Sequence, residues 1–164
     1  MGIVSFIKEA GEKLFGGSSA VAAAIAEPSS QEKLAAANEV ASKAIKTYIN
    51  AQGLPGDALT VSFNGADQLV TVSGAVASQE IREKIVVCCG NVQNVAGVID
   101  DMQAPEEPES TYHTVERGDT LSAISKKAYG NANLYNVIFE ANRPMLSHPD
   151  KIYPGQVLRI PPKP

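Results

Sequence analysis

The C-terminal third of the chain contains two segments that together define a small folding unit: Tyr112-His113-Thr114-Val115-Glu116-Arg117-Gly118-Asp119-Thr120-Leu121-Ser122-Ala123-Ile124-Ser125 and, further along, Ile152-Tyr153-Pro154-Gly155-Gln156-Val157-Leu158-Arg159-Ile160-Pro161. The stretches 112–115 and 156–160 are predicted to form a pair of strands. Gly118-Asp119 and Pro154-Gly155 supply the residue types that turns require.

Between these strands the pattern favours two helices. Thr120 stands where a helix-capping residue is expected, so the first helix is predicted over 121–128. Tyr135, Ile138 and Phe139 give the second, over 135–142, an apolar face. With these motifs the segment 112–162 resembles a LysM domain, a βααβ module known for binding glycans that contain N-acetylglucosamine.

The resemblance implies a candidate glycan groove between the loop after the first strand and the loop before the last one. Its residues would be Gly118, Asp119, Thr120, Leu121, Ile152, Tyr153, Pro154 and Gly155. Backbone amides and carbonyls there could read N-acetyl groups, with Leu121 and Ile152 in apolar contact. The alternative is that these residues only build the turns and the core of the module.

Upstream, residues 30–102 show a different order of elements. A helix is predicted to start at Ser30, with an apolar stripe that includes Leu34, Ala37, Val40, Ala41, Ala44, Ile45 and Tyr48. Two alternating strands, 58–63 and 69–74, flank the turn residues 64–67. Another helix of this segment is predicted to start at Ser78, with Ile81, Ile85 and Cys88 or Cys89 facing inward. It is expected to end at Gly90-Asn91, a pair suited to the left-handed conformation that often follows a helix. A strand over 95–99 closes the unit.

This αββαβ order resembles a BON domain, and Gly74 suits the bend where the chain leaves the sheet. Residues 3–15 carry one apolar stripe, which predicts an amphipathic helix packed on the next domain. The expected organisation is therefore α+β: an N-terminal helix and Ala/Ser-rich connection (1–29), a BON domain (30–102), a stiff, solvated Pro/Glu linker (103–111) and a LysM domain (112–162).

Composition excludes several classes of protein. The formal net charge of −4 disfavours a nucleic-acid partner, and no apolar run is long enough for a transmembrane helix. The N-terminus lacks the basic start and continuous hydrophobic core of a secretory signal. The two cysteines, Cys88 and Cys89, are adjacent, so they are expected to be small buried side chains with free thiols, which suits a reducing compartment.

The residues that catalysis requires are scarce. The chain has two histidines, His113 and His148, and neither belongs to a metal-binding or phosphate-binding motif. The three glutamates of the linker lack the spacing of an oxygen-ligand loop. We therefore expect a binding protein rather than an enzyme.

Taken together, an amphipathic N-terminal segment, a BON-like unit and a LysM-like unit resemble the bacterial cytoplasmic potassium-binding proteins of BON–LysM architecture. The resemblance implies a monomeric, cytoplasmic K⁺ sensor or buffer, active in stress responses, whose two domains rearrange on binding the ion. Neutral carbonyl oxygens suit this large cation, and helix C-termini present such oxygens. By analogy with the family, the expected ligands are the main-chain oxygens of Ile7, Ala10, Gly90, Val92 and Val95, although a plain helix cap is the alternative for each. The alternative function is a peptidoglycan-binding envelope module, with LysM on the glycan and BON near lipid.

Overall fold

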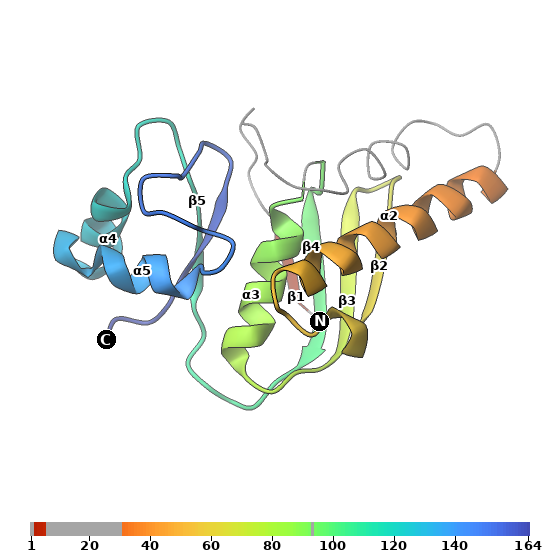
Figure 1. Ribbon diagram of the computed structural model, residues 1–164, viewed down its shortest axis with the longest axis horizontal. Helices are drawn as coiled ribbons and strands as arrows, with labels where there is room; N and C mark the ends of the chain where they lie inside the picture. The colour runs from red at the N-terminus through yellow and green to blue at the C-terminus, as the bar shows by residue number, and fades with distance from the viewer. Residues whose placement is uncertain (1, 6–30, 93) are drawn as a thin grey trace.

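The computed structural model describes residues 2–5, 31–92 and 94–164. They form two units (Figure 1), a larger one built on a four-stranded sheet and a smaller one built on a strand pair with two helices. The predicted α+β class is confirmed, as is the predicted order of an αββαβ unit followed by a βααβ unit.

The larger unit contains helices α2 (Gln31–Ala51) and α3 (Gln79–Gly90), a short 3-10 turn (Gly56–Ala58) and strands β1 (Gly2–Ser5), β2 (Thr60–Asn64), β3 (Leu69–Ala75) and β4 (Gly97–Gln103). The strand order is β1-β4-β3-β2. β2 and β3 form an antiparallel hairpin, whereas β3 and β4 are parallel because α3 crosses between them. α2 and α3 pack on one face of this sheet (Figure 1), where Ile45, Val70 and Val98 are completely buried.

Strand β1 corrects the predicted N-terminal helix over 3–15. Residues 2–5 are extended and pair antiparallel with β4, with Ser5 opposite Gly97. The first residues, Ile3 and Val4, are β-branched, and the otherwise open edge of β4 offers them backbone partners. The remainder of the predicted helix, from residue 6, lies outside the described residues.

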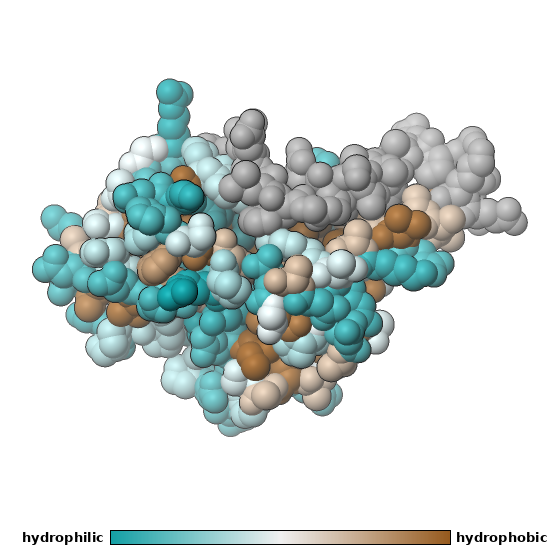
Figure 2. Space-filling model, in the orientation of Figure 1, coloured by the Kyte–Doolittle hydropathy of each residue, from teal (hydrophilic) through white to brown (hydrophobic). Residues whose placement is uncertain are grey.

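One residue of the apolar stripe predicted for helix α2 is not buried. Val40 is 58% exposed, whereas its neighbour Ala41 is completely buried. An apolar group lies over α2 on the surface in Figure 2. On both sides of Val40, α2 covers the free edge of β2. The Ser42 hydroxyl accepts a hydrogen bond from the Phe63 N–H at 2.8 Å, and the Asn38 side-chain oxygen accepts one from the Gly65 N–H at 3.0 Å.

The smaller unit consists of β5 (Thr111–Thr114), α4 (Leu121–Tyr129), a 3-10 turn (Ala132–Leu134), α5 (Tyr135–Ala141) and β6 (Val157–Ile160). β5 and β6 pair antiparallel. Thr120 caps α4 as predicted, since its hydroxyl accepts a hydrogen bond from the Ala123 N–H at 3.1 Å. Ile138, Leu146 and Leu158 are among the residues of a separate core.

Strand β4 continues to Gln103, and Ala104 packs on the core of the larger unit. Residues 105–109 are exposed. Within the described ranges, no helix has the length and apolar character needed to cross a membrane.

Candidate functional site

The loop between α3 and β4 follows a helix that is capped at its start and buried at its end. The Ser78 hydroxyl accepts a hydrogen bond from the Ile81 N–H, as the sequence predicts for the N-cap. At the other end no left-handed residue stands at Gly90 or Asn91, which corrects that prediction: Asn91 keeps a helical conformation, and Asn94 has the positive φ of 68°. The chain therefore continues to curl through Asn91 before it reverses.

Two main-chain carbonyls at the end of α3 and in this loop accept hydrogen bonds from residues of the loop itself. The Val92 N–H donates to the Cys89 carbonyl at 3.2 Å, and the Val95 N–H donates to the Val92 carbonyl at 3.2 Å. Gly90, Val92 and Val95 are all buried. Carbonyls at the end of a helix carry a partial negative charge, so a cation would be favoured there.

Three of the five residues expected to bind the ion, Gly90, Val92 and Val95, thus lie in one short loop. The other two, Ile7 and Ala10, lie outside the described residues. Ser5, however, pairs with Gly97, so β1 ends at the edge of the sheet where β4 begins.

The chemistry around this loop is neutral. In residues 2–5, 31–92 and 94–164, no three His, Cys, Asp or Glu side chains come together in a way that could hold a metal ion. Cys88 and Cys89 are free and completely buried, as predicted. Burial raises the pKa of both thiols, that of Cys89 to about 12, so neither is a thiolate ligand or nucleophile near neutral pH.

The same loop contacts the smaller unit through Asn91, which is 2% exposed. Its side-chain oxygen accepts a hydrogen bond from the Val157 N–H at 2.7 Å, and its amide nitrogen donates to the Val157 carbonyl at 2.9 Å. Val157, on β6, is counted within the core of the larger unit, and Tyr112 and Met145 pack against that core as well. The two units therefore share an apolar contact with polar bonds inside it.

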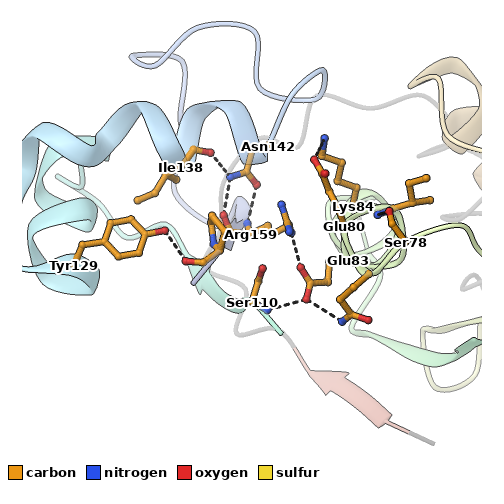
Figure 3. Close-up of polar contacts among 12 residues, drawn as sticks. Ser78, Glu80, Glu83, Lys84, Ser110, Tyr129, Ile138, Asn142 and Arg159 are labelled. Atoms are coloured by element: carbon orange, nitrogen blue, oxygen red, sulfur yellow. Dashed lines mark hydrogen bonds and ion pairs between the residues drawn. The ribbon is translucent and has the colours of Figure 1, made fainter. Parts of the chain in front are cut away.

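A buried ion pair forms a second link (Figure 3). Glu83 of α3 is 1% exposed and pairs with the Arg159 guanidinium of β6, Nε to Oε2, at 2.5 Å. The Gln79 amide and the Ser110 backbone N–H donate to the other carboxylate oxygen at 2.9 and 2.7 Å. Burial by itself raises the pKa of the Glu83 carboxyl, but the hydrogen bonds from Ser110, Arg159 and Gln79 outweigh it and hold that pKa below its ordinary value.

Tyrosines lie at this contact too. The pKa of the buried Tyr48 hydroxyl on α2 is raised by burial first, and then by the neighbouring Cys88 thiol and Tyr153 hydroxyl. Tyr153 belongs to the loop before β6, so that loop reaches the end of α2. One member of the expected glycan groove is thus turned toward the larger unit.

The smaller unit has a cleft of about 420 Å³ lined by Thr120, Leu121, Ser122, Tyr135, His148, Pro149 and Asp150. Thr120 and Leu121 belong to the expected groove, although Leu121 is 3% exposed and sits mainly in the core. Ile152 packs against that core, and Gly155 donates its N–H to the Val115 carbonyl in a turn beside the strand pair. Gly118 and Asp119 form the turn before α4, where Asp119 bonds His113 at 2.8 Å and the Glu116 N–H at 2.9 Å.

Comparison with known proteins identifies both units and a relative that spans them. The family model of the BON domain matches residues 35–105, and that of the LysM domain matches residues 113–161. Over 162 residues the chain is 48% identical to "Potassium binding protein Kbp" of Escherichia coli O6:H1 (strain CFT073), covering 98% of this chain and 99% of that protein. The chain belongs to the Kbp family.

Other relatives of this Kbp-family chain match over about one domain. An uncharacterized protein of Deinococcus radiodurans is 45% identical over 56 residues, which are 34% of this chain and 21% of that protein. Esterase Rv1288 of Mycobacterium tuberculosis is 45% identical over 53 residues, which are 32% of this chain and 11% of the esterase. A match to so small a part of an esterase carries no argument for esterase activity here.

Three residues at the contact between the two domains were not predicted from the sequence to lie there: Glu83, Asn91 and Arg159. Their partners are far away along the chain, with Glu83 and Arg159 separated by 76 residues and Asn91 and Val157 by 66. The sequence contained one signal. Glu83 and Arg159 occupy positions that face inward on their helix and strand, and buried charged side chains require partners.

Proposed function

We propose that this chain binds K⁺ through main-chain carbonyl oxygens of Ile7, Ala10, Gly90, Val92 and Val95. The observation that carries the proposal is the relative named a potassium binding protein, which aligns over almost the full length of both chains. The α3–β4 loop supports it, because neutral oxygens at a buried helix end suit a large monovalent cation better than a small divalent one.

The same proposal includes a response to the ion. α3 carries the proposed ion loop at its C-terminal end and also contributes Glu83 and Asn91 to the contact with the LysM domain. A change in the loop on binding would therefore be transmitted directly to that contact. We propose that the BON and LysM domains rearrange when K⁺ binds, and that the protein acts in the cytoplasm as a sensor or buffer of the ion.

Titration of the purified full-length chain, first freed of K⁺, is expected to give saturable binding heat with KCl and much weaker heat with NaCl. Na⁺ is smaller and holds its water more tightly, so carbonyls spaced for K⁺ replace its hydration poorly. Isothermal titration calorimetry measures both, and choline chloride at matched ionic strength is the control. Equal affinity for the two ions, or binding of Ca²⁺ in preference to K⁺, would contradict the proposal.

A second candidate function is glycan binding by the LysM domain at the cell envelope. The cleft beside Thr120 and Tyr135 favours it, since it lies on the domain that matches the LysM model. Retention of the chain on insoluble peptidoglycan, together with its recovery from the periplasm on cell fractionation, would favour this function. Recovery from the cytoplasm without retention would favour the first.

A further inference from the structure

Strand β6 is paired on both edges, but only one partner is a strand. β5 covers one edge, with Thr114 opposite Val157 and Tyr112 opposite Arg159. On the other edge, two asparagine side chains take the place of a strand. Asn142 donates to the Arg159 carbonyl at 2.8 Å and accepts from the Arg159 N–H at 2.7 Å (Figure 3), and Asn91 makes the same two bonds with Val157. A side-chain amide has both N–H donors and a carbonyl acceptor, so it satisfies both backbone groups of one strand residue.

These two asparagines come from different domains. Asn142 follows α5 and belongs to the LysM domain, whereas Asn91 follows α3 of the BON domain. Without the BON domain, the N–H and C=O of Val157 would lose both of their protein partners and could bond only to water. The edge of β6 is therefore complete only when the domains are docked.

Asn91 also stands between two residues of the proposed ion loop, Gly90 and Val92. Its main chain keeps a helical conformation while its side chain is fixed to β6 at both ends. Because rotating the peptide units on either side of Asn91 would break this pairing, docking on β6 restricts the directions of the neighbouring carbonyls.

We propose that Asn91 is a positioning residue for the ion, through which the backbone of Val157 in the LysM domain helps to set K⁺ affinity and selectivity. This inference rests on the proposed function, since it concerns the same loop. Linkage then requires reciprocity: docking strengthens K⁺ binding by the same factor by which K⁺ strengthens docking.

The test uses two variants of the full-length chain that break the pairing from opposite sides. Asn91→Ala removes the amide, and Val157→Pro removes the donor from the LysM side without altering the ion loop; the Val157 N–H points away from β5, so proline costs no bond between the strands. Each is expected to weaken K⁺ binding about ten-fold in calorimetry, with a smaller loss for Na⁺. In small-angle X-ray scattering, each is expected to need correspondingly more K⁺ to dock the two domains.

A matched control is Asn131→Ala, which removes the cap of the 3-10 turn Ala132–Leu134 in the LysM domain and leaves the pairing of Asn91 with Val157 intact. It is expected to leave K⁺ affinity and selectivity unchanged. If circular dichroism shows that Val157→Pro does not fold, Arg159→Met replaces it as the variant on the LysM side.

The outcomes separate the inference from the function on which it rests. If the unmodified chain binds no K⁺, the proposed function fails and the inference with it. If the unmodified chain binds K⁺ but the LysM-side variant keeps both its affinity and its K⁺ to Na⁺ ratio while scattering shows the domains apart, only the inference is overturned. The inference would also be overturned if Asn91→Ala lost K⁺ affinity while the LysM-side variant did not, since Asn91 would then act only within its own loop.

Discussion

Replacing Arg159 with methionine is expected to lower the free energy of unfolding of the full chain by about 3–5 kcal/mol, the usual cost of removing one partner of a buried ion pair. The Glu83 carboxylate is 1% exposed and would keep Gln79 and Ser110 as hydrogen-bond donors, but it would lose its counter-charge. A buried charge without compensation is far more costly than the pair is favourable. Chemical denaturation at neutral pH measures the change.

The control is Arg143→Ala, which removes an ion pair of the same chemistry at the surface. Arg143 and Glu140 lie 3.5 Å apart with side chains 57% and 64% exposed, so the expected loss is below about 1 kcal/mol. The double variant Glu83→Leu with Arg159→Met is expected to recover most of the stability, because no unpaired charge is left. If Arg159→Met and Arg143→Ala cost the same, the Glu83–Arg159 pair would not be buried in solution.

The pH profile distinguishes the loss of charge pairing from a simple packing defect. The pKa of Glu83 in the folded chain is held below its ordinary value, so the pair stabilises the fold above that ordinary value and the contribution is lost as pH falls through the lowered pKa. In Arg159→Met one of the groups that lowers this pKa is gone. The difference in stability between the two chains is therefore expected to be largest near neutral pH and to shrink under acidic conditions.

Replacing Gly74 with alanine is expected to lower the free energy of unfolding by about 2–4 kcal/mol, through backbone strain and overpacking together. Gly74 lies in β3 with φ of +130°, a conformation that side chains rarely allow. An added Cβ would also lie 2.8 Å from Leu59 Cδ2 and 3.4 Å from the Ala58 carbonyl oxygen. Thermal or chemical denaturation measures the effect.

Gly53→Ala supplies the comparison, because Gly53 also has a positive φ, +74°, but has nothing within 4 Å of an added Cβ. Only backbone strain is then expected, about 1–2 kcal/mol. The excess loss in Gly74→Ala reports the close approach of β3 to the chain at Leu59 together with the greater backbone strain at φ of +130°. Equal losses would show that this approach is looser in solution.

Local patterns predicted much of this fold. The features that depend on neighbouring residues are confirmed by the structure. They are the alternation in 58–63 and 69–74, the helix caps at Ser78 and Thr120, and the apolar faces of the helices over 121–128 and 135–142. Residues 3–5 were misassigned because three residues fit both a helical and an extended period. Their conformation is fixed by the edge of β4, about which the local sequence carries no information.

The candidate site could be predicted from the sequence only in part. Gly90, Val92 and Val95 were expected to bind the ion because of the family resemblance, not because of a side-chain pattern, since main-chain oxygens leave no signature in residue types. The expected end of α3 at Gly90-Asn91 was wrong in detail, because Asn91 is held by β6 rather than by a left-handed turn. Such a partner becomes visible only after both domains are folded and docked.

Tyr48, Tyr112 and Tyr153 all lie where the BON and LysM domains meet, and the chain has five tyrosines and no tryptophan. Most of the ultraviolet absorption of this protein therefore originates from chromophores whose surroundings depend on whether the domains are together. Separation would transfer these rings from an apolar environment to water, and their spectrum would shift accordingly. The tyrosine absorption of the unlabelled protein is therefore expected to report whether the two domains are in contact.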